Sequence, residues 1–286
     1  MKQLFSSIII ALLAAISVAC SDSADSRPVL VVSIEPQRFM LEQLAGDNYR
    51  IVVLMPGGEN PETFELPVSR HIEVDTAHAV FTVGYLPFEQ SLADSGKGHI
   101  VATTSGITPI YGTHSHTTAS GQSHTHRSAD PHLWTSVRNA RIICQAMADE
   151  LIRLCPDSAD IYRARLNKYC AHLDSLDAAF AARLSAANAN SFLVWHPSLS
   201  YFARDYGLNQ ISVSQHNKDI SPAALRHVID NAAASGAHVL FNQREYDARQ
   251  VQTIGDAIGA RVVDFNPGNY DWEAELTLVV NELSKP

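Results

Sequence analysis

The sequence is poor in positive charge. It has 21 lysine and arginine residues against 30 aspartate and glutamate residues, which gives a formal net charge of −9 over 286 residues. Proteins that bind nucleic acids need a basic face to meet the phosphates, so this class of function is excluded. A negative balance suits a protein that meets cations, although many soluble proteins are equally acidic.

Long apolar runs are missing after residue 20. The apolar run near the N-terminus, residues 4–16, follows Lys2 and is shorter than the about 20 residues of a transmembrane helix. It predicts a cleaved export signal over residues 1–19. Cys20 directly follows the small residue Ala19. This arrangement resembles a lipobox, a motif whose cysteine is acylated. Plain secretory cleavage near Ala19 is the alternative. We therefore expect an extracytoplasmic protein held at a membrane by a lipid on Cys20, with residues 20–27 as a polar tether.

Cysteine is scarce, with four residues in all and no C-x-x-C spacing of the kind found in metal sites. After Cys20, the chain contains Cys144, Cys155 and Cys170. If the helices expected over residues 142–154 and 158–187 pack antiparallel, Cys144 lies level with Cys170. An oxidised pair is one interpretation, and three buried free thiols are the other.

Short apolar runs alternate with helix-compatible stretches along most of the chain. Continuous Val/Ile-rich runs between helices indicate parallel strands that are covered on both faces. The expected strands are residues 29–34, 50–55, 79–83, 99–103, 192–195, 210–213, 239–242 and 261–265. The fold class is therefore α/β, with two βα lobes over residues 28–157 and 188–286, joined by a long linking helix over residues 158–187. Ligands bind beyond the carboxyl ends of such strands, so the cleft between the lobes is the expected site.

Residues 111–127 fit neither lobe. The segment is polar, rich in serine, threonine and glycine, and carries His114, His116, His124 and His126. Because it lacks apolar residues, we predict a mobile loop. We interpret its histidines as an auxiliary metal site, which should hold zinc more weakly than a preformed site because ordering a flexible loop costs entropy.

Three segments near strand or helix ends carry residues of metal-ligand type. Glu62 lies in GGENPETFEL, His132 in DPHLW and His196 in WHPSLS. Singly, Glu62 could cap a turn, His132 could cap a helix and His196 could be a buried core residue. Together they can converge only if the two lobes face each other, and imidazoles with one carboxylate suit zinc better than magnesium or calcium. Asp130 could orient His132 by accepting a hydrogen bond.

The segments 59–66 (ENPETFEL), 130–140 (DPHLWTSVRNA) and 195–207 (WHPSLSYFARDYG) resemble those of the zinc type of metal-binding solute-binding proteins. These are the extracytoplasmic partners of zinc and manganese ABC importers, and the resemblance covers essentially the whole mature chain. It implies that His132 and His196 are ligands and that the partners are an ABC permease and its ATPase. It also implies Zn²⁺ as the transported ligand, with Mn²⁺ or Fe²⁺ as the alternative, because manganese members usually have glutamate in place of His196. A monomer is expected.

The chain departs from the family pattern at two positions. Glu62 stands where the family usually has its first histidine, and Asn266 stands where an aspartate usually supplies the fourth ligand. The two changes compensate in charge, so we expect that the carboxylate has moved across the cleft. The fourth position is left open between Asn266, Asp264, a second Glu62 oxygen and water. Gln243, Arg244 and Glu245 also follow a strand end, where a role at the rim of the cleft is conceivable.

Two other classes of function compete with a binding protein. A zinc hydrolase could use Glu62 as a general base, but the chain has no H-E-x-x-H helix and no G-x-S-x-G elbow. An adhesive or structural lipoprotein could use the same fold without transport. We therefore do not expect an enzyme.

Overall fold

A computed structural model describes residues 25–95, 98–117, 123–213, 221–243, 246 and 248–285. The export signal expected over residues 1–19 and the acylation site expected at Cys20 lie outside the described residues. Within these ranges, none of the helices combines the length and the apolar character that a membrane span requires.

The N-terminal lobe is built on a four-stranded parallel sheet in the order β2-β1-β3-β4. Its elements are β1 (Val29–Val32), α2 (Glu35–Ala45), η1 (Gly46–Asn48), β2 (Arg50–Val53), η2 (Val68–Arg70), α3 (His71–Thr76), β3 (Ala79–Thr82), α4 (Pro87–Ser95) and β4 (Ile100–Ala102). The central strands β1 and β3 are almost wholly buried, as expected for apolar runs covered on both faces.

The C-terminal lobe repeats this arrangement. Its elements are β7 (Ser191–Val194), α7 (Ser200–Tyr206), β8 (Asn209–Ser212), α8 (Pro222–Ser235), β9 (Val239–Gln243), α9 (Ala248–Ile258), β10 (Arg261–Phe265) and α10 (Trp272–Leu283). The sheet is parallel in the order β10-β9-β7-β8. In both lobes the first strand lies between the second and the third, so each sheet has a topological switch point beside its first strand.

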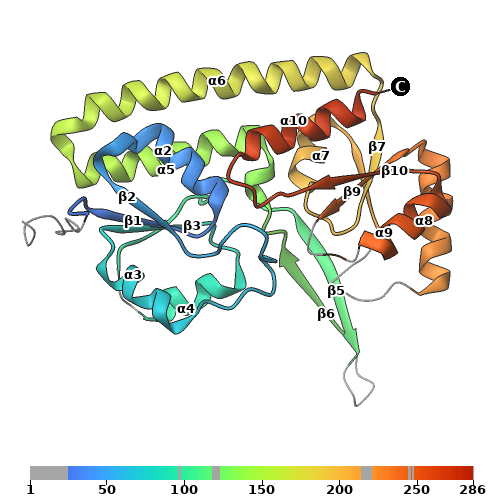
Figure 1. The fold of residues 1–286 in the computed structure, drawn as a ribbon, viewed down its shortest axis with the longest axis horizontal. Coiled ribbons are helices and arrows are strands. Elements are labelled where there is room, and N and C mark those ends of the chain that lie inside the picture. Colours follow the sequence, from blue (N-terminus) through green and yellow to red (C-terminus); the bar gives the residue numbers. More distant parts are fainter. Residues whose placement is uncertain are drawn as a thin grey trace, which may run out of the picture.

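Helices join the two lobes. After η3 (Leu133–Thr135), α5 (Val137–Leu154) turns through η4 (Pro156–Ser158) into α6 (Ala159–Ala186), which runs along the outside of both lobes (Figure 1). Ser136 caps α5 by accepting a hydrogen bond from the N–H of Asn139. The predicted α/β fold with two parallel sheets and a long linking helix is therefore confirmed.

One hydrophobic core runs through both lobes. It includes buried residues of both sheets and of the linking helices, such as Leu30, Phe81, Met147, Phe241 and Trp272. A smaller core lies under α8 and α9 of the C-terminal lobe. Because the lobes share the larger core, they are held together by packing and not by a flexible linker.

The three cysteines of the folded chain are free thiols. Cys144 is buried, whereas Cys155 and Cys170 are partly exposed. Burial raises the pKa of the Cys144 thiol well above its ordinary value, because a low-dielectric interior disfavours the thiolate. The oxidised Cys144–Cys170 pair, one of our two interpretations, is absent from the structure.

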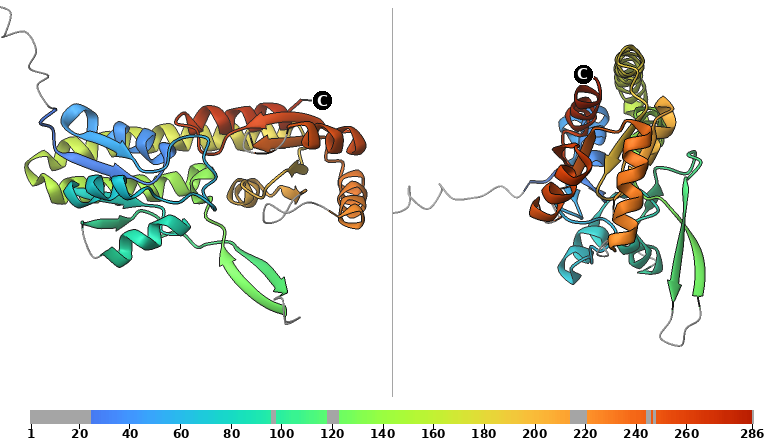
Figure 2. Two further views of the ribbon diagram at one scale, coloured as in Figure 1. Left: turned by 60° about the horizontal axis from the view of Figure 1, so that its bottom comes forward. Right: turned by 90° about the vertical axis from the view of Figure 1, so that its right-hand side faces the viewer.

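The histidine-rich segment is a hairpin. Strands β5 (Tyr111–Thr117) and β6 (Ser123–Ala129) pair antiparallel, with His114 opposite His126 and His116 opposite His124. They form a separate two-stranded sheet that stands off the body of the protein (Figure 2). The prediction of a loop was wrong for residues 111–117 and 123–129, because the two backbones satisfy each other's hydrogen bonds without an apolar face. Residues 118–122 and the four histidine side chains lie outside the described part of the structure.

Candidate metal centre

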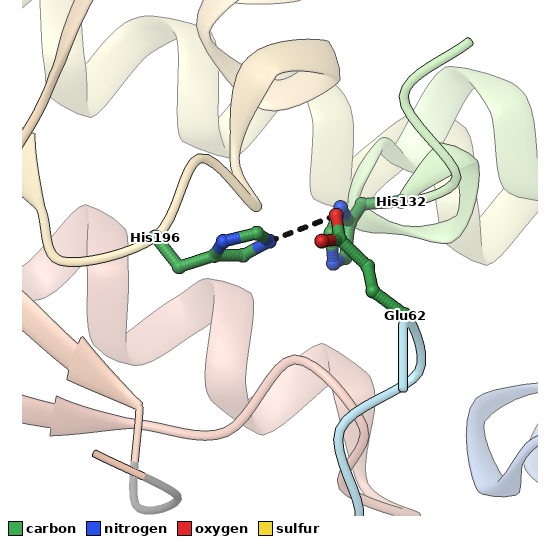
Figure 3. A group of neighbouring side chains, drawn as sticks. All are labelled: Glu62, His132 and His196. Carbon is green, nitrogen blue, oxygen red and sulfur yellow. Dashed lines mark ion pairs between the residues drawn. The ribbon is translucent and has the colours of Figure 1, made fainter. Parts of the chain in front are cut away.

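Three of the predicted ligands lie together between the lobes. Glu62, His132 and His196 each offer one ligand atom, and these atoms all lie within 4.8 Å of one another. The three side chains come from separate segments and point toward one another (Figure 3). Nε2 of His196 lies 3.1 Å from Oε1 of Glu62, and this contact joins the two lobes.

Glu62 is positioned by the loop that follows β2. The side chain of Asn60 accepts a hydrogen bond from the N–H of Glu62 at 2.9 Å, which fixes the local turn. Two residues further on, the ring of Phe64 packs edge-on against Phe88 at 5.1 Å and ties the loop to α4. The Glu62 side chain is 32% exposed, so this ligand faces the approach from solvent.

Asp130 lies against His132. Nδ1 of His132 lies 2.9 Å from Oδ1 of Asp130, and the same oxygen accepts the backbone N–H of His132. A protonated Nδ1 that donates to this carboxylate places the lone pair on Nε2, the nitrogen that can bind a cation. Tyr201 anchors the segment, because its hydroxyl donates to the Asp130 carbonyl and accepts from the N–H of Ile110.

His196 lies two residues beyond β7 and is buried. Its ring contacts that of His132 at a centroid distance of 5.4 Å and stacks on Tyr246 at 6.2 Å. Nδ1 of His196 has no hydrogen-bond partner among the residues that the structure describes. The ring is therefore held by packing and by its contact with Glu62, and not by a carboxylate of its own.

The electrostatic balance of the site favours ionised carboxylates. Burial pushes the pKa of Glu62 upward, but contact with His196 and the charge of the two imidazoles outweigh it, so the pKa is lowered. Burial also acts against ionised Asp130, and the hydrogen bond with His132 again lowers the pKa overall. The site therefore presents negative charge to an incoming cation at neutral pH.

The donor set fits a zinc-sized ion. A tetrahedral ion with ligand distances of about 2.0–2.2 Å holds its donors roughly 3.3–3.6 Å apart. The donors here are spread over at most 4.8 Å, so a small contraction would bring them into range. Two imidazole nitrogens and one carboxylate also match the ligand types that zinc accepts.

The structure places the candidates for the fourth position near the end of β10. The side-chain oxygen of Asn266 accepts a hydrogen bond from the N–H of Gly268 at 3.0 Å. Asp264 is exposed and accepts a hydrogen bond from Asn242 at 3.1 Å.

Sequence reasoning missed the contact between Tyr246 and His196. Tyr246 follows β9 by three residues, in a stretch where neither apolar periodicity nor a ligand-type residue pattern marks a site. The sequence analysis noted the neighbouring Gln243, Arg244 and Glu245 for following a strand end, and the same position in a parallel sheet is the signal that points to Tyr246.

Comparison with known proteins bears on these observations. The family model described as zinc-uptake complex component A, periplasmic (ZnuA), matches residues 30–275. The zinc-binding lipoprotein AdcA of Streptococcus pneumoniae is 28% identical over 239 residues, which cover 79% of this chain and 47% of AdcA. This chain thus spans about half the length of that relative.

Solved structures share the fold. A crystal structure of ZnuA has a TM-score of 0.79 and 29% identity, covering 91% of this chain and 98% of the other. A manganese-bound periplasmic metal-binding protein from Candidatus Liberibacter asiaticus has a TM-score of 0.73 and 18% identity, covering 90% of this chain and 100% of the other. The latter shows the fold alone.

The family model matches most of the chain, and its members are metal-binding transport components and not enzymes. The hydrolase alternative therefore has no support. This chain belongs to the family of zinc-uptake complex component A, the periplasmic metal-binding components of ABC importers.

Proposed function

We propose that this protein captures Zn²⁺ outside the cytoplasmic membrane and delivers it to an ABC permease. The observation that carries the proposal is the convergence of Glu62, His132 and His196, which come from three separate segments and both lobes. Three side chains of metal-ligand type from distant segments share one place, and two of them, His132 and His196, are buried. Each brings a donor atom that zinc accepts.

Asp130 has a defined part in this function. Its hydrogen bond to Nδ1 of His132 holds the ring orientation and makes Nε2 the nitrogen for the cation. Among the described residues no carboxylate bonds to Nδ1 of His196, and Glu62 lies against its Nε2. A cation that enters between them replaces this contact, with Glu62 and His196 both turning from each other to the ion.

Zinc is favoured over manganese by the donor types. Two nitrogens in a set of three donors bind zinc more strongly than manganese or iron(II) in the usual order of divalent metals. The relative AdcA is described as zinc-binding, and a ZnuA deletion mutant with zinc bound has a TM-score of 0.78 at 29% identity. The manganese-bound neighbour is 18% identical and supports only the fold, so manganese or iron is the alternative cargo.

The charge of the site suits one divalent ion. Glu62 supplies one negative charge, and the two imidazoles bind in their neutral forms. Asn266, a second Glu62 oxygen or water can complete the set without further charge. Among these, Asn266 has its side-chain oxygen engaged by Gly268.

Delivery requires the protein to stay close to the membrane. Acylation of Cys20 would anchor it there, with residues 20–27 as the tether, and AdcA of Streptococcus pneumoniae is itself described as a lipoprotein. We propose that His114, His116, His124 and His126 form an auxiliary metal site that passes zinc to the cleft. Their register in the hairpin brings two histidines of each strand opposite two of the other.

Calorimetric titration of residues 21–286 with zinc tests the proposal. We expect one tight site that Glu62→Ala, His132→Ala and His196→Ala each weaken strongly, with manganese bound far less tightly. His238→Ala changes an exposed histidine of the C-terminal lobe and serves as the matched control, with no effect on the tight site. Tight binding that survives all three substitutions would refute the assignment of the site.

A further inference from the structure

The end of β9 carries a buried amide with nothing to bond to. Gln243 is 2% exposed, and among the described residues neither its Oε1 nor its Nε2 has a hydrogen-bond partner. Burying an amide without partners is costly, and the large majority of buried side-chain polar atoms have a hydrogen-bond partner. A bound ligand that interacts with the amide would remove this cost.

The position of Gln243 in the sheet is that of a ligand-binding residue. Strand β9 lies next to β7 with Val194 opposite Phe241, and the N–H of Trp195 donates to the carbonyl of Phe241, one step beyond the strand. His196 and Gln243 are each two residues further along from that pair. Both therefore lie at the carboxyl ends of the two strands that flank the switch point of this sheet, where α/β proteins bind their ligands.

The strand pattern also gives the two side chains a common direction. Val194 and Phe241 both belong to the large core that the lobes share, whereas Leu193 and Leu240 belong to the smaller core on the other face. Side chains two residues apart on a strand point to the same face. His196 and Gln243 lie two residues beyond Val194 and Phe241. If the alternation continues, their side chains lie on the same side of the sheet as those of Val194 and Phe241.

A turn ties Gln243 to the ring of His196. The backbone N–H of Tyr246 donates to the carbonyl of Gln243 at 3.1 Å, and the Tyr246 ring stacks on His196. The hydroxyl of Ser198 and Nδ1 of His196 are also buried without hydrogen-bond partners in the described structure. Polar atoms without a hydrogen-bond partner thus occur on His196 and on Ser198, two residues beyond it.

We propose that the side-chain oxygen of Gln243 fills the fourth position around the captured cation, in place of Asn266. This inference rests on the proposed zinc capture by Glu62, His132 and His196. Asn266 is partly exposed and its oxygen already accepts from Gly268, whereas the oxygen of Gln243 accepts from no group. A neutral amide oxygen keeps the charge of the ligand set at one negative, which Glu62 supplies.

The test compares Gln243→Leu with Asn266→Leu in residues 21–286. Zinc affinity is measured by competition with a chromophoric chelator, and the ligand set is followed by the visible absorption of bound Co²⁺. We expect Gln243→Leu to weaken zinc by about tenfold or more, the scale seen for groups that support a metal site, and to change the Co²⁺ spectrum. Asn266→Leu should leave both unchanged.

Unfolding of the metal-free variants separates a ligand from a structural residue. Because leucine replaces an amide that has no partners, metal-free Gln243→Leu should unfold at the same temperature as the parent or at a higher one. Gln243→Glu, which keeps an oxygen donor and adds charge, should bind zinc at least as tightly as the parent. A lower unfolding temperature of the metal-free Gln243→Leu protein would identify Gln243 as a structural residue and overturn the proposal.

The outcomes also separate this inference from the proposed function. If His132→Ala abolishes tight binding while Gln243→Leu binds zinc within twofold of the parent, only the assignment of Gln243 is wrong. The same holds if Asn266→Leu is the variant that weakens binding. If His132→Ala leaves tight binding intact, the inter-lobe site itself is refuted.

Discussion

Nε2 of His196 lies 3.1 Å from Oε1 of Glu62, and this contact joins the C-terminal lobe to the loop after β2 in the N-terminal lobe. The two residues supply a nitrogen and an oxygen of the proposed zinc site. This contact places the two proposed ligands against each other across the lobes. Zinc must compete with this internal contact. Substitutions at either residue therefore change both the metal-free and the zinc-bound protein.

Neutralising Glu62 should weaken zinc capture without unfolding the protein. Glu62→Gln keeps the shape and one oxygen donor but removes the only carboxylate of the proposed ligand set. We expect zinc affinity to fall by about tenfold or more, measured by chelator competition. Glu59→Gln changes an exposed carboxylate in the same loop and should have no effect; an equal loss in both variants would point to general electrostatics.

Asp130 should contribute to affinity through His132. Asp130→Asn removes the charge that accepts the Nδ1 proton, so the ring loses its fixed tautomer and orientation. Loss of such a hydrogen-bond partner typically costs 10–100-fold in metal affinity, and we expect a loss of about this size by calorimetry. Asp157→Asn, at an exposed aspartate of η4, is the control, and unchanged affinity in Asp130→Asn would contradict the assigned role.

Zinc affinity should decrease as the pH is lowered. Imidazole binds a cation only in its neutral form, so protons compete with zinc for the two histidines, and the apparent affinity decreases as pH falls toward the usual histidine range of about 6.5 and below. Titrations between about pH 7.5 and 5.5 measure this effect. An affinity that stays flat across this range would exclude histidine ligands.

The buried residue Glu89 should stabilise the N-terminal lobe. Its buried carboxylate accepts the hydroxyl of Ser33 and the backbone N–H groups of Val83, Gly84 and Leu86. Glu89→Gln places amide N–H groups against these donors, so we expect a loss of about 1–3 kcal/mol in the free energy of unfolding. Urea unfolding of the metal-free protein measures it, and Glu59→Gln is the control.

The sign of the pH dependence follows from the pKa of Glu89. Burial raises this pKa above its ordinary value of 4.5, and the hydrogen bonds offset the effect only in part. The folded protein therefore binds more protons than the unfolded chain just above pH 4.5, and its stability falls as pH rises through the folded-state pKa. The difference in the free energy of unfolding between the parent and Glu89→Gln should be smaller at neutral pH than near pH 4. The opposite trend would show that the pKa of Glu89 is lowered.

Removal of the hairpin should reduce zinc uptake at limiting zinc and leave the zinc affinity of the inter-lobe site unchanged. Strands β5 and β6 pair only with each other, so deletion of residues 113–127 should leave both lobes folded and the cleft affinity unchanged. If the four histidines collect zinc, uptake at limiting zinc should decrease and calorimetry should lose a weaker site. Unchanged uptake at limiting zinc would remove the auxiliary role.

Much of the fold followed from local patterns. The apolar runs that became β1, β3, β7 and β9 are short and flanked by helix-forming stretches, and they predict buried parallel strands without reference to the rest of the chain. The long linking helix was equally local, because no strand-type run interrupts the residues of α5 and α6. The hairpin escaped prediction because its strands are polar and are stabilised by their pairing, which apolar periodicity does not reveal.

The sequence by itself determined the ligand types, the α/β class and the resemblance to a zinc-binding family, because motifs and periodicities are local properties. Only the tertiary structure decided that Glu62, His132 and His196 meet within 4.8 Å, that Cys144 and Cys170 are not bonded to each other, and that Gln243 is buried without a hydrogen-bond partner among the described residues. These facts depend on how two sheets are placed against one another through a shared core. No single segment carries that information, because packing sums contributions from the whole chain.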